Sequence, residues 1–242
     1  MKLTRYKRES SYSYTLGATL TYELLKTHPE LIQRVFLRPN IKHGNDLEQI
    51  IAALKQRHIE IIESTKAFNI LNAKSNCLLI AEFQKPATQL DYSVNNPHIV
   101  LVNPSDAGNL GTIMRSAVGF GYQNLAIILP GVDPYDPKTI RASMGAAFHL
   151  NIQTFESFQA YQNPFTTRTY YAFMLDPAAK RLTDVNPISK NYSLIFGNEA
   201  SGLPSEFATF TTPIFIPQNQ KIDSLNLSVA ASIAMFELST RQ

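Results

Sequence analysis

Hydrophobic residues recur along the chain in two spacings, one typical of helices and one of buried strands. After Asp46, apolar residues at i, i+3, i+4 and i+7 predict an amphipathic helix with Asp46 as its N-cap. Short uninterrupted apolar runs predict strands that are covered on both faces. The predicted strands are 32–37, 77–83, 99–103, 125–129, 170–175, 193–197 and 211–217, with an alternating segment at 58–63 and helices at 21–27, 110–118, 139–148 and 225–240.

The order of these elements divides the chain in two. Strands and helices up to residue 90 predict a small α/β domain at 1–90. Residues 84–97, with two prolines, two adjacent asparagines and little periodicity, predict a linker. From residue 98 onward, apolar strands alternate with helices more clearly. This alternation predicts an α/β domain at 98–242 with a mostly parallel sheet that carries helices on both faces.

Charge is distributed unequally between the two parts. The net charge of the chain is +3, but the first 90 residues hold 13 Lys and Arg against 8 Asp and Glu, whereas the remainder holds 9 against 11. A basic first domain indicates a polyanionic partner. An ordinary solvated surface explains the same excess equally well, so charge alone leaves both interpretations open.

Several classes of protein are disfavoured by what the sequence lacks. No apolar stretch approaches the roughly 20 residues that span a bilayer, and the basic N-terminus has no apolar segment of the signal-peptide kind. Glu9 argues against a transit peptide. The single Cys77 excludes an internal disulfide, and the five scattered histidines show no zinc-type spacing. We therefore expect a cytoplasmic protein without a bound metal and without a membrane partner.

Three segments at the ends of predicted strands carry candidate chemistry. The first, 103–117, opens a helix with a Gly-Asn pair, where free backbone N–H groups face the carboxyl edge of the sheet at which ligands bind. Gly111, Arg115 and Gly119 follow at intervals of four residues. The glycines leave room for a large ligand to reach the arginine, although helix packing beside a surface arginine explains the same spacing.

The second and third segments are loops. Residues 195–204 hold two glycines and a proline, which predict a tight, non-helical turn around Glu199. Residues 216–234 hold a strand end, a short polar loop and a final helix capped by Ser224 or Asp223. Taken singly, polar residues in such places more commonly cap helices or satisfy turns than catalyse reactions.

Together and in this order, the three segments resemble the signature motifs of the SpoU-type methyltransferases, in the SPOUT class. The family has Asn and Arg six residues apart in the first motif, G-N-E-x-x-G-L in the second, and I-P followed by S-L-N-x-S-V-A in the third. The matching positions are Asn109 and Arg115; Gly197, Asn198, Glu199, Gly202 and Leu203; and Ile216, Pro217, Ser224, Leu225, Asn226, Ser228, Val229 and Ala230. Residues 140–150 also look like the family's region between the first two motifs.

The resemblance covers residues 98–242 and departs from the family at one point. The family commonly has Met after the I-P pair, whereas this chain has Gln218, so the shape of this loop or its affinity for the cofactor is expected to differ. Residues 1–90 resemble the small substrate-binding domain, related to a ribosomal protein fold, that is often fused ahead of this catalytic domain.

The resemblance implies an S-adenosyl-L-methionine-dependent RNA 2′-O-ribose methyltransferase whose second domain contains a deep trefoil knot. It implies a donor site formed by Gly197, Asn198, Ile216, Pro217 and Leu225. It implies catalysis by Arg115, with Asn109, Glu199, Ser224 and Asn226 orienting the arginine and the ribose. Because a guanidinium keeps its proton, we expect Arg115 to pair with an RNA phosphate and stabilise the developing oxyanion.

The resemblance also implies a homodimer in which the long apolar final helix contributes buried surface. The first domain favours large-subunit ribosomal RNA as substrate, with transfer RNA or an antibiotic-binding rRNA loop as alternatives. Candidate contacts with the RNA backbone are Lys2, Arg5, Lys7 and Arg8. A non-catalytic RNA-binding protein on the same fold is the alternative from another class, and a nicotinamide-dependent enzyme is disfavoured because the glycine fingerprint is incomplete at 119–124.

Overall fold

The chain forms two compact units. The computed structural model describes residues 3–40, 44–92, 96–176, 178–186, 190–219 and 221–241, so Lys2 and the linker positions 93–95 lie outside the described residues. Unit 1 comprises Met1–Ala87 and Asp133–Phe148, and unit 2 comprises Thr88–Val132 and His149–Gln242. Residues 133–148 fall within the predicted domain 98–242, yet they pack in unit 1.

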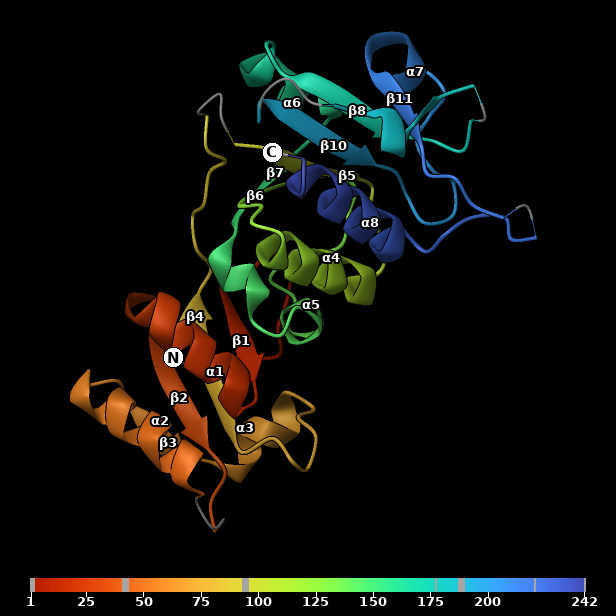
Figure 1. Ribbon diagram of the computed structural model, residues 1–242. Helices are drawn as coiled ribbons and strands as arrows, with labels where there is room; N and C mark the ends of the chain where they lie inside the picture. The colour runs from red at the N-terminus through yellow and green to blue at the C-terminus, as the bar shows by residue number, and fades with distance from the viewer. Residues whose placement is uncertain are drawn as a thin grey trace. The chain divides into compact units, whose positions relative to one another are not determined.

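Unit 1 is built on a four-stranded mixed sheet in the order β1-β4-β2-β3 (Figure 1). β4 (Leu79–Gln84) is antiparallel to β1 (Tyr12–Leu16) and to β2 (Ile32–Leu37), and β3 (Ile61–Glu63) is parallel to β2. The helices of this unit are α1 (Ala18–Thr27), α2 (Asn45–Gln56), α3 (Thr65–Ile70) and α5 (Pro137–Ala142), with 3₁₀ turns at Pro29–Leu31 and Ala146–His149.

The segment 133–148 contributes to the core of unit 1. Ile140 and Phe148 are buried in the same apolar cluster as Leu24 of α1 and Leu54 of α2. The ring of Phe83 in β4 meets that of Phe148 edge-to-face at 5.4 Å. This packing secures the segment to unit 1, although its chain neighbours on both sides belong to unit 2.

The single helix predicted over 139–148 is wrong in its second half. α5 ends at Ala142, and a separate 3₁₀ turn begins at Ala146. Between them, Met144 has φ 52° and Gly145 has φ 89°. A right-handed helix cannot pass through residues with positive φ, so the chain must turn there.

Unit 2 contains a seven-stranded sheet within the described residues, in the order β7-β6-β5-β10-β8-β11-β9. All of its strand pairs are parallel, which confirms the predicted mostly parallel sheet. The strands are β5 (His98–Val102), β6 (Asn124–Ile128), β7 (Asn151–Phe155), β8 (Thr169–Phe173), β9 (Lys180–Arg181), β10 (Tyr192–Phe196) and β11 (Thr212–Phe215).

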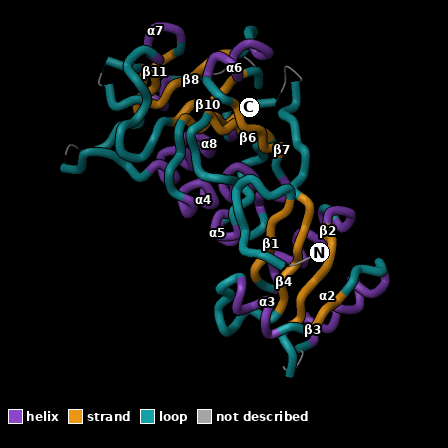
Figure 2. The backbone as a smooth tube through the Cα atoms, turned by 180° about the vertical axis from the view of Figure 1, so that it is seen from behind, coloured by secondary structure: helices purple, strands orange, loops and turns teal. Residues whose placement is uncertain are grey.

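Helices cover both faces of this sheet. α4 (Ala107–Gly119) and α8 (Leu227–Ser239) lie side by side on one face, and α6 (Phe158–Gln162) and α7 (Phe207–Phe210) lie on the other (Figures 1 and 2). Two 3₁₀ turns, Asn163–Phe165 and Leu182–Asp184, complete the unit. β10 and β6 are buried at every position, as their mostly apolar sequences predict. No helix of the described residues is long and apolar enough to cross a membrane.

The sequence misplaced two helix caps and missed three strands. Gly44, which makes no side-chain cap bond, is the N-cap of α2, so Asp46 lies inside the first turn. Asn226 caps α8 by accepting a hydrogen bond from the N–H of Ser228, which corrects the choice of Ser224 or Asp223. β1 and β7 were missed because their polar residues break the apolar run that marks the central strands, and β9 was missed because it consists of two charged residues.

Candidate active site

The candidate site lies where the order of strands in the sheet of unit 2 reverses. The chain runs from β5 outward through β6 and β7, and then returns to fill the other side of β5 with β10, β8 and β11. The loops that follow β5 and β10 are therefore neighbours at the carboxyl edge of the sheet. In open parallel sheets this reversal point is the usual place for a ligand.

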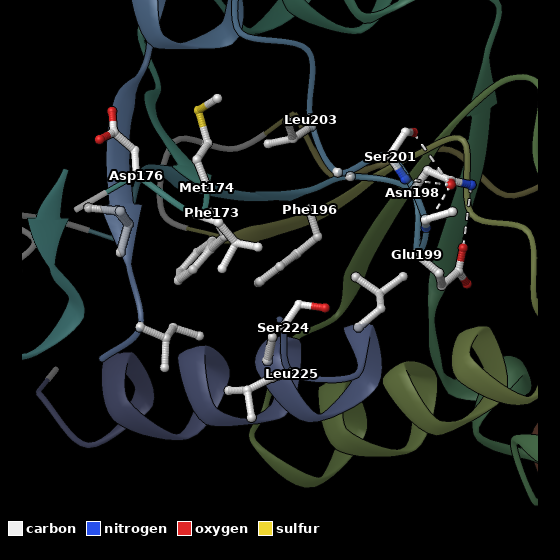
Figure 3. Close-up of a pocket in the computed structure, with 18 of the residues that line it drawn as sticks. Phe173, Met174, Asp176, Phe196, Asn198, Glu199, Ser201, Leu203, Ser224 and Leu225 are labelled. Carbon is white, nitrogen blue, oxygen red and sulfur yellow. Dashed lines mark hydrogen bonds between the residues drawn. The ribbon is translucent and has the colours of Figure 1, made fainter. Parts of the chain in front are cut away.

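A cavity of about 390 Å³ opens at this edge beside β10, β8 and β11. Phe173 and Phe196, whose rings stack at 4.4 Å, lie across it from Ser224 and Leu225 (Figure 3). Further lining residues are Met174, Leu175, Asp176, Gly197, Asn198, Glu199, Ala200, Ser201, Gly202, Leu203, Ser205, Ile214, Ile216, Gln218, Leu227 and Ala230. A largely apolar cavity with a few polar groups is typical of small-molecule sites of roughly 300–1,000 Å³.

The turn after β10 shapes one wall of this cavity. Asn198 and Gly202 pair through their backbones, and the side-chain oxygen of Asn198 accepts hydrogen bonds from the N–H groups of Ala200 at 2.9 Å and Ser201 at 3.2 Å. A Cβ on Gly197 would lie 2.1 Å from the carbonyl carbon of Gly202. Only glycine fits at position 197, and the predicted tight, non-helical turn is confirmed.

Glu199, in the same turn, binds the beginning of α4. Its Oε2 accepts hydrogen bonds from the backbone N–H of Ser105 at 3.0 Å and from the Ser105 hydroxyl at 2.7 Å. Its Oε1 accepts from the N–H of Asp106 at 3.2 Å and from the Nδ2 of Asn109 at 3.2 Å. The carboxylate thus holds the loop after β5 and the start of α4 against the loop after β10.

Hydrogen bonds determine the charge state of Glu199. Burial alone would raise the pKa of this carboxyl group, but the bonds from Ser105, from its own backbone N–H and from Asn109 outweigh burial and lower the pKa below its ordinary value. Glu199 is therefore a carboxylate at neutral pH. A group with a lowered pKa and occupied oxygens is suited to holding structure rather than to accepting a proton.

The third motif joins the same network through Asn226. Its Nδ2 donates to the Oδ1 of Asn109 at 3.0 Å, and its Oδ1 accepts from the backbone N–H of Ser228 at 2.8 Å and from the Ser228 hydroxyl at 2.7 Å. Asn109 therefore bridges Glu199 and Asn226. The network ties the first turns of α4 and α8 to the turn after β10.

The structure gathers most of the predicted site residues but leaves two, Arg115 and Pro217, outside both the network and the cavity. Arg115 is exposed on α4, two helical turns beyond the network, and it makes no hydrogen bond or ion pair with any described residue. Ser224 lines the cavity without joining the network. Pro217 is exposed and does not line the cavity, whereas Gly197, Asn198, Ile216 and Leu225 do.

Sequence reasoning missed other residues of the site. Ser105 and Asp106 supply the donors for Glu199, and their position directly before a helix is a signal for capping. Asp176 follows β8 and lines the cavity. It comes just after the strand predicted at 170–175, so the rule that ligands bind at strand ends would have found it. No group of His, Cys, Asp or Glu in the described part of the chain is arranged to hold a metal ion.

A comparison with protein families agrees with this geometry. The model of the SpoU rRNA Methylase family matches residues 96–236, which is more than half of the chain. The chain belongs to the SpoU rRNA Methylase family. The match includes all the residues of the network and the cavity.

Similar proteins fall in two groups by the length that aligns. An uncharacterized tRNA/rRNA methyltransferase of Synechocystis is 30% identical over 145 residues, which cover 60% of this chain and 53% of that protein, so the chain spans about half of its length. RlmP of Bacillus subtilis, a 23S rRNA guanosine 2′-O-methyltransferase, is 23% identical over 97% of this chain and 92% of its own.

Solved structures share the whole fold of this SpoU family member. The crystal structure of an AdoMet-bound rRNA methyltransferase from Sinorhizobium meliloti has a TM-score of 0.82 and 24% sequence identity. It covers 96% of this chain and 88% of its own. Both units therefore have counterparts in one solved chain.

Proposed function

We propose that this protein is an S-adenosyl-L-methionine-dependent RNA 2′-O-ribose methyltransferase. The observation that carries the proposal is that the second and third motif loops line one cavity at the carboxyl edge of the sheet, and that Asn109 of the first motif is hydrogen-bonded to both loops. The family match and the names of the relatives support the same reaction. The Synechocystis and Bacillus relatives are both named as RNA methyltransferases.

The cavity fits a nucleoside-sized methyl donor. Its volume of about 390 Å³ lies within the range of small-molecule sites, and its walls combine stacked aromatic rings with backbone of the turn after β10. The residues that would hold the donor are Gly197, Asn198, Ile216 and Leu225. When bound, the donor supplies an electrophilic methyl group on a sulfonium.

Arg115 is the residue that we assign to the RNA. Its guanidinium is exposed and has no described partner, so it is available to a phosphate next to the target ribose. A bidentate arginine–phosphate pair orients the ribose hydroxyl and stabilises negative charge as the hydroxyl loses its proton. The start of α4, the helix that carries Arg115, is held in place by hydrogen bonds among Asn109, Glu199 and Asn226.

Turnover of Arg115 variants tests this role. Because a lysine is a point charge that cannot form a planar fork, we expect Arg115→Lys and Arg115→Ala both to lose most activity while donor binding is retained. Methyl transfer to RNA and calorimetric binding of S-adenosylmethionine are the two measurements. If both variants turn over at the wild-type rate, the assignment is wrong.

Ribosomal RNA of the large subunit is the substrate that we propose. RlmP, named for 23S rRNA, aligns with this chain over both units, and the basic excess lies in the first 90 residues. Arg5, Lys7 and Arg8 are exposed and are candidate RNA contacts. Transfer RNA remains the second candidate substrate, because the Synechocystis relative is named for both RNAs.

Mapping of ribose methylation tests the reaction and the substrate together. Ribosomal and transfer RNA from a deletion strain are mapped for 2′-O-methyl sites. We expect the loss of a site in large-subunit rRNA and its return with the wild-type gene. Loss of a tRNA site instead would select the second substrate, whereas survival of every site contradicts the proposed reaction. S-adenosylmethionine binding without methyl transfer would favour a non-catalytic binder.

We also propose that the protein is a homodimer whose interface includes α8. One face of this helix packs in the core through Ala231, Ala234 and Leu238. The opposite face is exposed and also apolar, with Val229, Ile233 and Phe236 at helical spacing. A helix that is apolar all round is normally buried, so a second copy of the chain is the partner that this face requires.

Light scattering tests the dimer. At micromolar concentration the wild-type chain is expected to have the mass of two chains, and Ile233→Glu is expected to have the mass of one, because a buried charge without a partner is costly. Tyr22→Glu, which changes an exposed residue of unit 1, is the matched control. A monomeric wild type contradicts the proposal. The trefoil knot and the cytoplasmic location stay predictions from the sequence.

A further inference from the structure

The charged residues that line the cavity all have one sign. Among its described lining residues, Asp176 and Glu199 are the charged side chains, and Lys, Arg and His are not represented. Figure 3 shows the two carboxylates on opposite sides of the pocket. A cavity with fixed negative charge and no cation in its described lining attracts a cationic ligand more strongly than a neutral one of the same shape.

The two carboxylates differ in what they are free to do. Both oxygens of Glu199 are occupied by donors from the loop after β5 and the start of α4. Asp176 is exposed, and its Oδ1 accepts one hydrogen bond from the N–H of Ala178 at 2.9 Å. Its Oδ2 makes no hydrogen bond with a described residue. Asp176 therefore carries the charge that is available to a ligand.

The methyl donor and its product differ by one charge. Both contain the same adenosine and the same zwitterionic amino acid, so these parts contribute equally to their affinities. The donor also carries a positive sulfonium. In the transfer, the sulfonium carbon–sulfur bond breaks, its electrons stay on sulfur, the methyl group bonds to the ribose oxygen, and the hydroxyl proton is released. The product is a neutral thioether.

We infer that Asp176 is a specificity-determining residue of this pocket, whose carboxylate favours the cationic donor S-adenosylmethionine over the neutral product S-adenosylhomocysteine. The inference rests on the proposed function. It gives the pocket a means of releasing its product, because the attraction falls when the methyl group leaves. The residue acts through its charge and makes no bond to the reacting atoms.

Calorimetry on Asp176→Asn tests this role without measuring activity. Asparagine has the same shape and keeps an oxygen for the Ala178 N–H, so the turn is preserved and the charge is removed. We expect the affinity for S-adenosylmethionine to fall about three- to fivefold, as befits a partly exposed charge interaction. The affinity for S-adenosylhomocysteine is expected to stay unchanged. Sinefungin, which carries an amine in place of the sulfonium, is expected to follow the donor.

A matched variant distinguishes the effect of the Asp176 charge from the effect of removing any negative charge from the protein. Glu156→Gln removes one exposed carboxylate just after β7, three strands and roughly 14 Å from β10 across the sheet. It is expected to leave all three affinities unchanged. Higher salt is expected to reduce the preference of the wild type for the cationic ligands, and to have less effect on Asp176→Asn.

The outcomes distinguish this inference from the proposed function. If Asp176→Asn changes the affinities for donor and product by the same factor, or if Glu156→Gln lowers the donor-to-product ratio equally, the role of Asp176 is wrong while the proposed function stands. If the wild type binds neither ligand, the proposed function fails and the inference fails with it.

Discussion

The two edges of the seven-stranded sheet each carry a polar network, and the two networks are built on opposite principles. The carboxyl edge holds Glu199, Asn109 and Asn226, partly open to solvent and next to the cavity. The amino edge holds Arg168 and His98, both buried. The comparison separates polar groups that are arranged for a ligand from polar groups that are arranged for the fold.

The network at the amino edge is a continuous series of hydrogen bonds between buried side chains. The Nε of Arg168 donates to the Ser193 hydroxyl at 3.1 Å, and Ser193 and Tyr161 share a bond of 2.6 Å. Tyr161 meets the Nδ1 of His98 at 3.0 Å, while the Nε2 of His98 lies 3.2 Å from the carbonyl oxygen of Asp91. Because a carbonyl only accepts, Nε2 carries the proton and Nδ1 accepts from Tyr161.

The larger pKa shift lies at the edge without the cavity. Burial, assisted by the charge of Arg168, lowers the pKa of His98 from 6.5 to about 3. At the cavity, Glu199 shows a lowered pKa for which hydrogen bonds outweigh burial. A strong shift on a fully buried group therefore reports its desolvation. The carboxyl edge is marked as the site by the cavity of about 390 Å³ together with the motif residues gathered beside it.

Substitution of Arg168 is expected to have the largest effect, and only on stability. Arg168→Met removes a buried guanidinium that donates to the carbonyls of Asn96 and Tyr192 and to the Ser193 hydroxyl. We expect a loss of about 3 kcal/mol in the free energy of unfolding, measured by urea denaturation. Donor affinity of the folded variant should remain near wild type. A selective loss of donor binding at unchanged stability would contradict the separation of the two edges.

A change at Gly197 is expected to act mainly on the site. In Gly197→Ala the new Cβ collides with the backbone of Gly202, so the turn after β10 must move. We expect methyl transfer to fall about 100-fold, equivalent to about 2.7 kcal/mol, because a displaced turn misplaces the donor. Gly119→Ala, where the Cβ meets open space, is the matched control for donor binding by calorimetry. If Gly197→Ala and Gly119→Ala have the same donor affinity and the same rate of methyl transfer, the role of the turn is wrong.

Replacement of Glu199 tests whether the network at the carboxyl edge supports both fold and function. Glu199→Gln offers one acceptor oxygen to donors that now occupy two. We expect a stability loss of about 1.5 kcal/mol, discounted for partial exposure, together with weaker donor binding. Glu156→Gln serves again as the charge control. Because the pKa of Glu199 is lowered, its stabilising effect is present above its ordinary pKa and is lost as pH falls through the lowered value.

At neutral pH the smallest expected effect is that of His98, whose contribution to stability depends on pH only below about 6.5. The unfolded chain takes up a proton near pH 6.5, whereas the folded chain resists protonation down to about pH 3. Stability should therefore fall as pH drops through this window, by about 1.4 kcal/mol per pH unit. Denaturation between pH 6.5 and 5 measures the slope before most carboxyl groups titrate. His98→Gln should remove the slope, and a change at the exposed His149 should not.

Local sequence patterns were sufficient to predict the central strands of the second unit and the turn around Glu199. β5, β6 and β10 are apolar runs that indicate buried strands on their own, and the turn around Glu199 is marked by Gly197 and Gly202. These features depend on a few neighbouring residues, so a linear pattern is enough to predict them. The motif positions are equally local, which is why they indicate the family without reference to the fold.

The contacts that build the site could not be predicted from the local sequence pattern. Asn109 meets Glu199 across 90 residues of chain and Asn226 across 117, so only the folded sheet brings them together. Arg115 is grouped with them by sequence but stands alone on α4.

The sequence of this protein therefore specified which residues matter and which strands carry them, because burial and turn formation act between near neighbours. The folded structure decided the partners of Glu199, the exposure of Arg115 and the packing of residues 133–148 in unit 1. Each of these depends on atoms that are distant along the chain, and on the competition among them for the same donors and the same core.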